Sequence, residues 1–141
     1  MYRIVFAIDS DEQRAQTMTE TVLALPREPE DIEVTILNVF QEFDAADDMG
    51  RAKSSDYFDK DDFPASVNIV QEALEAAGAQ VILQREHGDP SEKILAIAED
   101  VDADAIAISG RKRSPAGKVL FGSVTQSVLL SATRPVIVTT Q

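Results

Sequence analysis

The sequence predicts an α/β fold, in which a parallel sheet of five strands is covered on both faces by four helices. Short apolar segments rich in β-branched residues alternate along the chain with segments whose apolar residues recur at helical spacing. Such alternation implies right-handed crossovers between parallel strands. The chain has 141 residues, and no repeat or linker divides it. Residues 1–141 are therefore expected to form a single domain.

Five segments are expected to be buried strands, because each is short, apolar and mostly β-branched. In chain order they are YRIVFAI (2–8), VTILNV (34–39), QVILQ (80–84), AIAI (105–108) and PVIVTT (135–140).

Four helices are expected between these strands. Three cover about residues 11–25, 64–77 and 90–100, and the fourth begins near residue 123. Gly78 is expected to end the second helix, and Pro90 suits the first position of the third. An N-cap residue followed three positions later by Glu or Gln marks the starts of the first, third and fourth helices. These pairs are Ser10 with Gln13, Asp89 with Glu92, and Ser123 with Gln126.

Charge is distributed unevenly along the chain. The 13 Lys and Arg against 25 Asp and Glu give a net charge of −12. Residues 1–104 hold all 25 acids and 8 bases, whereas residues 105–141 hold 5 bases and no acid. The overall field disfavours nucleic acid as a partner. The acidic surface, with 8 Arg against 5 Lys, suggests a salt-adapted, halophilic protein; an ordinary acidic cytosolic protein is the alternative.

Composition excludes several classes of protein. With no cysteine and a single histidine, His87, the chain has no disulfide framework, thiolate metal centre, cysteine nucleophile or histidine-based zinc site. No apolar run approaches the roughly 20 residues that span a membrane. The N-terminal segment becomes acidic too early for a secretory signal. We therefore expect a cytoplasmic protein that does not bind membranes.

The connection from Gln41 to Phe63 is longer than this architecture requires. Connections of this length tend to be lids, partner surfaces or mobile segments, and the sequence leaves its role open. Its acidic run lacks the ligand spacing of a calcium loop, so a solvated acidic face is the better interpretation. That run consists of Asp56, Asp59, Asp61 and Asp62.

The second long connection, from Gly110 to Gly122, suits an anion. Ligands of open parallel sheets bind at the carboxyl ends of the strands, where this connection begins. Gly122 would permit close backbone approach, and Ser123, as N-cap of the last helix, would donate its hydroxyl to a phosphate oxygen. The alternative is a glycine-hinged surface loop whose bases pair with acids elsewhere. The bases are Arg111, Lys112, Arg113 and Lys118.

Motifs of known nucleotide and hydrolase sites are missing from the sequence. The chain has no G-x-x-x-x-G-K-[ST], no G-x-G-x-x-G after the first strand and no G-x-S-x-G. His87, which precedes Gly88, is better interpreted as a surface or packing residue than as a general base. No residue stands out as catalytic, so a transferase or hydrolase that consumes ATP is the weakest of the alternatives.

Four blocks, in order, resemble the universal stress protein family over essentially the whole chain. The resemblance implies a Rossmann-like sheet of the adenine nucleotide alpha hydrolase type, with strand order 3-2-1-4-5. It also implies a stress-response or regulatory role, and a homodimer paired through the last strand, from Pro135 to Thr140. The blocks are IVFAIDSDE, VTILNVF, EHGDPSEKILAIAEDVDADAIAISG and GKVLFGSVTQSVLLSATRPVIVTT.

The ATP-binding branch of that family carries the signature G-x2-G-x9-G-[ST]. The resemblance implies that Asp9 contacts ribose and that the backbone of Val39 contacts adenine. The chain departs from the signature at Arg113, which stands at the second glycine, and in a spacing one residue shorter. Arginine side chains could there replace backbone donors. The candidate nucleotide-binding residues are Ala7, Asp9, Ser10, Val39, Ser109, Gly110, Arg111, Arg113, Gly122, Ser123, Val124 and Thr125.

The expected function is therefore regulatory binding of an adenine nucleotide, either ATP or AMP, with Mg²⁺ accompanying ATP. Hydrolysis of ATP is expected to be slow or incidental, because the sequence offers no catalytic base and no carboxylate pair for magnesium. The alternative is a nucleotide-free dimeric module that acts by holding a partner protein.

Overall fold

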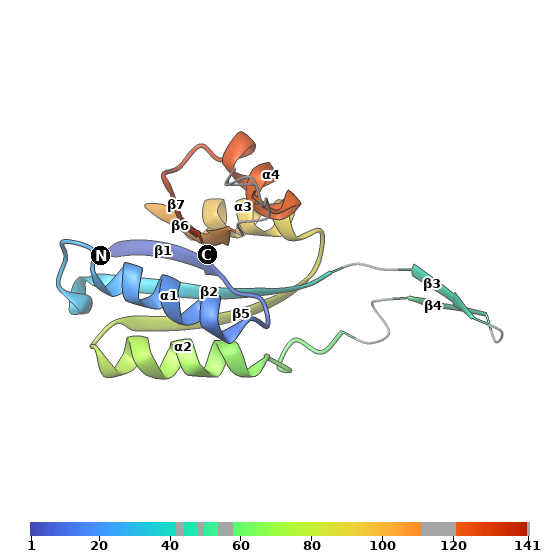
Figure 1. The fold of residues 1–141 in the computed structure, drawn as a ribbon, viewed down its shortest axis with the longest axis horizontal. Helices are drawn as coiled ribbons and strands as arrows, with labels where there is room; N and C mark the ends of the chain where they lie inside the picture. Colours follow the sequence, from blue (N-terminus) through green and yellow to red (C-terminus); the bar gives the residue numbers. More distant parts are fainter. Residues whose placement is uncertain (42–43, 48–49, 54–57, 111–120, 141) are drawn as a thin grey trace, which may run out of the picture.

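A computed structural model describes residues 1–41, 44–47, 50–53, 58–110 and 121–140 (Figure 1). Strands and helices alternate along these residues, as the sequence predicts. The elements are β1 (Tyr2–Ala7), α1 (Glu12–Leu23), the 3-10 helix η1 (Pro29–Asp31), β2 (Ile32–Gln41), β3 (Asp44–Asp47), β4 (Gly50–Lys53), α2 (Ala65–Ala76), β5 (Gln80–Gly88), α3 (Pro90–Asp100), β6 (Ala105–Gly110), α4 (Ser123–Ser131) and β7 (Val136–Thr140).

Five strands form one sheet in the order β5-β2-β1-β6-β7, and every neighbouring pair is parallel. Among these five strands, counted along the chain, the order is 3-2-1-4-5, so the predicted fold class and topology are confirmed. The order reverses at β1, which has β2 on one side and β6 on the other. Ligands of doubly wound sheets bind beside such a reversal.

Two helical layers enclose the sheet: α1 and α2 cover one face, and α3 and α4 cover the other (Figure 1). Alternate side chains of β1 enter the two layers. Ile4 and Phe6 are buried in the cluster with α1 and α2, whereas Val5 is buried in the cluster with α3 and α4. Burial on both faces explains why the central strands read as continuous apolar runs.

Helix starts differ from the predicted caps at two of three places. The N-cap of α1 is Asp11 instead of Ser10, because the Asp11 carboxylate accepts the backbone N–H of Arg14 at 2.9 Å. The N-cap of α4 is Gly122, so Ser123 lies inside the first turn. Asp89 caps α3 as predicted. Gly78 follows the C-cap of α2 with φ of +104°, which confirms it as the helix stop.

The strands β3 and β4 form a separate antiparallel pair inside the long connection, which the sequence analysis missed. Their residues are mostly Asp, Ala, Gly and Lys, which are depleted in strands, so no strand pattern was visible. Figure 1 shows this hairpin standing clear of the five-stranded sheet. The strands β2 and β5 are also longer than predicted and extend toward the side on which the hairpin lies.

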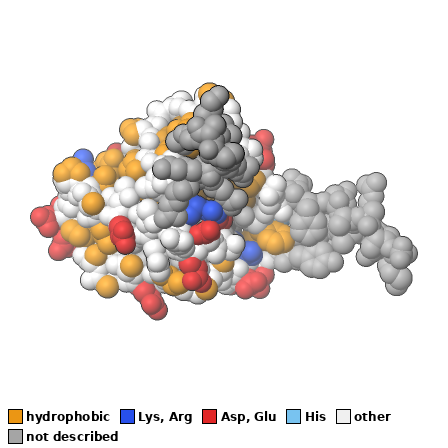
Figure 2. All heavy atoms as spheres, viewed as in Figure 1, with side chains coloured by type: hydrophobic (Ala, Val, Ile, Leu, Met, Phe, Trp, Pro, Cys, Tyr) orange, Lys and Arg blue, Asp and Glu red, His pale blue; other side chains and the backbone are white. Residues whose placement is uncertain are grey.

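The sheet has two edge strands, β5 and β7. The last strand therefore lies at an edge, as predicted. Asp and Glu side chains are scattered over the face of the molecule shown in Figure 2, which is consistent with a solvated acidic surface. Among the described residues, no helix has the length and apolar character required to cross a membrane.

Candidate functional site

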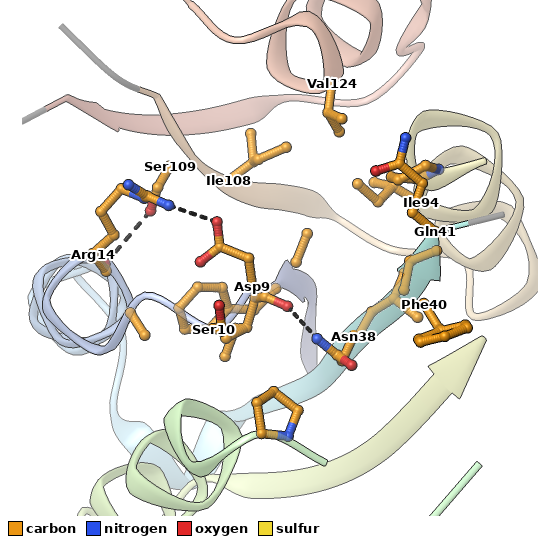
Figure 3. Close-up of a pocket in the computed structure, with 18 of the residues that line it drawn as sticks. Asp9, Ser10, Arg14, Asn38, Phe40, Gln41, Ile94, Ile108, Ser109 and Val124 are labelled. Atoms are coloured by element: carbon orange, nitrogen blue, oxygen red, sulfur yellow. Dashed lines mark hydrogen bonds and ion pairs between the residues drawn. The ribbon is translucent and has the colours of Figure 1, made fainter. Parts of the chain in front are cut away.

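A pocket of about 640 Å³ lies at the carboxyl ends of the central strands, beside the reversal of strand order. Its walls come from the ends of β1, β2 and β6, from β5, from the first turns of α1, α3 and α4, and from the segment just before α2. Figure 3 shows residues of these segments facing one another across the pocket. The volume and the position are those of a small-molecule site in an α/β protein.

One wall of the pocket is apolar. Ile94 of α3, Ile108 of β6 and Val124 of α4 converge there, and Phe40 of β2 lies farther along (Figure 3). Ile94 and Ile108 are buried in the core beneath α3 and α4. Such a surface suits the flat face of an aromatic ring, because contact with it removes apolar area from water.

Asp9, directly after β1, supplies a carboxylate to the pocket. Its Oδ1 accepts the Asp11 backbone N–H at 2.9 Å, and its Oδ2 accepts the guanidinium of Arg14 at 2.6 Å (Figure 3). The Asp9 carbonyl accepts the hydroxyl of Ser66, on α2, at 2.5 Å. The side chain of Asp9 is nevertheless 57% exposed, so a ligand can reach it.

Asn38 joins the ends of three neighbouring strands. Its Nδ2 donates to the Ile8 carbonyl at 2.9 Å, and its Oδ1 accepts from Arg85 Nε at 2.9 Å. Arg85, from β5, also donates to the Asp59 carbonyl at 2.5 Å. The buried amide thereby orients the strand end next to Val39 and ties it to the segment that returns from the hairpin.

The helix α4 presents an open N-terminus to the pocket. Gly122, the N-cap, contributes no side-chain hydrogen bond, and residues 122–125 all line the pocket. The backbone N–H groups of a first turn have no partner within the helix and favour an anion. Buried Thr125 donates its hydroxyl to the Ser109 carbonyl at 3.0 Å, which ties this turn to β6.

The helix α3 begins beside the same pocket but carries its own anion. The backbone amide of Glu92 and the hydroxyl of Ser91 both donate to the Asp89 carboxylate, at 3.1 and 2.8 Å. These bonds hold the pKa of Asp89 below its ordinary value. The first turn of α3 is thus capped by the chain itself, and Pro90 fills its first position.

An aromatic cluster adjoins the pocket at the ends of β2 and β5. The ring centroids of Phe40, Phe58 and His87 lie 5.6 to 6.0 Å apart. The guanidinium carbon of Arg85 lies 5.2 Å from the Phe40 ring centroid and 5.5 Å from that of Phe58. His87 is therefore a packing residue, as the sequence indicated.

The structure brings most of the predicted site residues together around the pocket. Gly110 ends β6 but does not line the pocket; a Cβ there would lie 2.8 Å from Phe121 Cδ1, so its absence permits that contact. Arg111 and Arg113 fall outside the described residues. The predicted residues that line the pocket are Ala7, Asp9, Ser10, Val39, Ser109, Gly122, Ser123, Val124 and Thr125.

Several lining residues were not predicted, and some left a signal in the sequence. Asn38 is a lone amide inside a buried apolar strand, where an unpaired polar group would be costly. Arg14 is a single base within the acidic start of α1. Arg85 and Phe40 gave no signal, because their role depends on how far β2 and β5 extend.

Metal binding by the acidic run finds no support in the part of the chain that the structure describes. Among those residues, no group of three or more His, Cys, Asp or Glu is placed to hold a metal ion. Asp56, one member of the run, lies outside them. The backbone N–H of Asp61 donates to the Asp59 carboxylate at 3.0 Å, which is a local turn.

The fold and pocket define a parallel α/β protein with a pocket at its topological switch point, where ligands of such folds bind. The profile of the Universal stress protein family matches residues 1–140, and the chain belongs to that family. A universal stress protein of Mycolicibacterium smegmatis is 35% identical over 72 residues, which are 50% of this chain and 55% of that relative. The match thus spans about half the length of this curated relative.

Solved structures match over nearly the whole chain. A universal stress protein from Archaeoglobus fulgidus aligns with a TM-score of 0.72 and 27% identity, covering 98% of both chains. The structure of the Archaeoglobus fulgidus protein in complex with dAMP aligns at 0.65 with 23% identity, over 98% of this chain and 97% of that one. A universal stress protein in complex with cAMP aligns at 0.64 with 16% identity, over 99% and 96%.

Proposed function

We propose that this protein is a stress-response or regulatory protein that binds an adenine nucleotide, AMP or ATP, in the pocket beside β1. The observation that carries the proposal is the combination of three features in one pocket. An exposed carboxylate at Asp9, an apolar wall and the open start of α4 suit ribose, base and phosphate respectively. Where ATP is the ligand, we expect Mg²⁺ to enter with it.

The pocket offers a place for each part of a nucleotide. The ribose hydroxyl groups would donate to Asp9, and the phosphate would lie against the first turn of α4 at Gly122 and Ser123. The base would pack against the apolar wall near Ile94, within reach of the Val39 backbone. Two relatives of the same fold whose structures are described as complexes with dAMP and cAMP support an adenine nucleotide.

Two measurements test the proposal. Purified protein, denatured and examined by mass spectrometry, should release an adenine nucleotide, or the empty protein should bind AMP or ATP in a calorimetric titration. Saturating ligand should raise stability by about 2.7 kcal/mol at a hundred times its Kd. GMP at matched ionic strength is the control for base recognition. Absence of released nucleotide together with no heat for ATP, ADP or AMP would reject the proposal.

A second candidate function is a nucleotide-free module that binds a partner protein. It is favoured by the β3–β4 hairpin, which stands clear of the body of the molecule. A two-stranded hairpin is at best marginally stable alone in water, so a surface that covers it would stabilise it. This candidate predicts that Gly122→Asp leaves cellular function intact. Loss of function with an unchanged fold would count against it.

We also propose a homodimer that forms through β7. This strand lies at the edge of the sheet, and its apolar side chains Val136, Ile137 and Val138 are only half-buried in one chain. Pairing of two such edges across a two-fold axis would cover them. Light scattering should give twice the mass of the chain; the mass of one chain would reject the dimer. Residence in the cytoplasm and a salt-adapted surface stay predictions.

A further inference from the structure

Arg14 is the cation that the described walls of the pocket place against Asp9, and the nucleotide signature does not include it. It lies in the first turns of α1 and its side chain is only 15% exposed. Figure 3 shows its guanidinium directed at Asp9 and the Ser109 hydroxyl directed at its backbone carbonyl. An arginine so enclosed has a defined position and can hold a neighbouring side chain in place.

The geometry of Arg14 is that of a clamp on two carboxylates. Its Nη2 lies 2.6 Å from Asp9 Oδ2, and its Nη1 lies 3.1 Å from Asp11 Oδ2. The Arg14 backbone N–H donates to Asp11, and the Ser109 hydroxyl oxygen lies 3.5 Å from the Arg14 carbonyl oxygen. Arg14 is thus fixed at both its backbone and its guanidinium, between the end of β1 and β6.

These contacts fix the direction of the Asp9 carboxylate. One oxygen accepts the Asp11 N–H and the other accepts Arg14, so rotation of the carboxylate would break a charge-assisted bond. An exposed aspartate would otherwise sample several rotamers, and a ligand would have to select one of them. Holding the acceptor in place before binding reduces that entropic cost.

We propose that Arg14 is a positioning residue that presents Asp9 to ribose hydroxyl groups and makes the pocket prefer ligands with a free ribose diol. The inference rests on the proposed nucleotide function. Direct binding of phosphate by Arg14 is the competing role. It is disfavoured because both terminal nitrogens of Arg14 already contact carboxylates, whose negative charges neutralise the guanidinium and would repel an anion.

The test compares AMP with 2′,3′-dideoxy-AMP, which lacks both ribose hydroxyl donors. The ratio of their Kd values isolates the diol, because a change in pocket charge affects both monophosphates alike. We expect the intact protein to prefer AMP by roughly tenfold or more, since each hydrogen bond to a charged acceptor contributes about 1.5–3 kcal/mol. Arg14→Gln should bring the ratio of the two Kd values to within a few-fold of one, mainly by weakening the binding of AMP.

Three further variants make the result specific. Asp9→Asn should reduce the ratio as Arg14→Gln does, because it removes the negative charge of the acceptor and replaces one of its two oxygens with an N–H donor. Arg14→Lys keeps one cation beside Asp9 and should restore part of the preference; it also serves if the glutamine variant does not fold. Arg27→Gln removes an arginine that lies over the Tyr2 ring, away from the pocket, and should leave the ratio unchanged.

The outcomes separate the inference from the function on which it rests. If the intact protein binds AMP and Arg14→Gln keeps the full preference for the diol, the positioning role is wrong and the nucleotide function stands. If Arg14→Gln weakens both ligands equally, Arg14 contacts the phosphate and the inference is overturned. If the intact protein binds neither ligand, the proposed function fails and the inference falls with it.

Discussion

The helices α3 and α4 begin beside the same pocket, yet their first turns are completed in different ways. At α3 the carboxylate of Asp89 accepts the Glu92 amide and occupies the place of an anion. At α4 the N-cap is Gly122, which provides no side-chain acceptor. The unpaired N–H groups of a first turn favour negative charge in both cases. The start of α3 is therefore capped by the chain itself, whereas the start of α4 has no side-chain cap among the described residues.

This difference bears on how an acidic protein would bind the anionic ligand proposed for the pocket. The net charge of −12 repels anions at long range, but that field is screened within about 10 Å in ordinary salt. Oriented N–H groups act at contact distance, where Gly122 permits a close approach. In the proposed function, the local geometry at α4 governs the binding of the small anion, and the overall charge disfavours large polyanions.

The largest expected effect comes from giving α4 the carboxylate that α3 has. Gly122→Asp should weaken AMP binding by roughly 100-fold or more, since a carboxylate at the phosphate position adds about 3 kcal/mol of repulsion. It should not destabilise the fold, because Gly122 has φ of −63° and Asp is a better N-cap than Gly. Calorimetry and thermal unfolding measure the two effects.

Gly122→Asn is the matched control for that substitution. Asparagine has nearly the size and capping ability of aspartate but no charge, so it should weaken AMP only several-fold. Equal losses in the two variants would show that bulk, and not charge, closes the start of α4. A loss of thermal stability in both would contradict the assignment of Gly122 as the N-cap.

The next largest expected effect is on stability, through the hydrogen bond that ties the first turn of α4 to β6. Thr125→Val removes the hydroxyl that donates to the Ser109 carbonyl and should lower the free energy of unfolding by about 1 kcal/mol. Urea unfolding measures it. Ser127→Ala, which removes an exposed hydroxyl from the same helix, should change stability by less than about 0.5 kcal/mol. Equal effects would mean that Thr125 is not the tether.

The smallest expected effect is the pH dependence of the stability that Asp89 contributes as the N-cap of α3. The folded-state pKa of Asp89 is lowered, so its contribution to stability is fully present above the unfolded-state pKa of about 4 and is lost as pH falls through the folded value. Asp89→Asn keeps a capping side chain without the charge. The wild-type advantage over this variant in urea unfolding should therefore be greater at pH 7 than at pH 3.

Two observations would contradict this account of α3. One is a wild-type advantage that grows as the pH falls, which would require a raised pKa for Asp89. The other is a change in AMP affinity at pH 7 in Asp89→Asn, because the first turn of α3 is already satisfied by the chain. Either result would mean that the two helix starts are less different than their caps indicate.

The sequence was sufficient to predict the sheet and several of the residues that line the pocket. Buried parallel strands leave continuous apolar runs, and the ends of those runs place Asp9 and Ser109 at one edge of the sheet. Asp89 was visible as an N-cap because Glu92 follows at the right spacing. These features are local in sequence, so patterns of a few residues reveal them.

Features that depend on exact helix phase or on distant contacts were not predictable. The N-cap of α1 is Asp11 and not Ser10. The hydrogen bonds that link Asp9, Asp11 and Arg14 form only in the folded turn, so the sequence did not reveal them. Arg85 reaches Asn38 across 47 positions of sequence. The β3–β4 hairpin lacks both β-branched residues and apolar alternation, so its strands resembled an ordinary polar connection.

The contact between Gly110 and Phe121 has a consequence for how the length of the connection between them could be changed. Because Phe121 packs within reach of the missing Gly110 side chain, the two ends of the ten intervening residues are joined at their base. The cost of closing a connection grows only slowly with its length, by about 0.6 kcal/mol for each doubling. Residues can therefore be added or removed between these two positions while α4 keeps its starting point on β6.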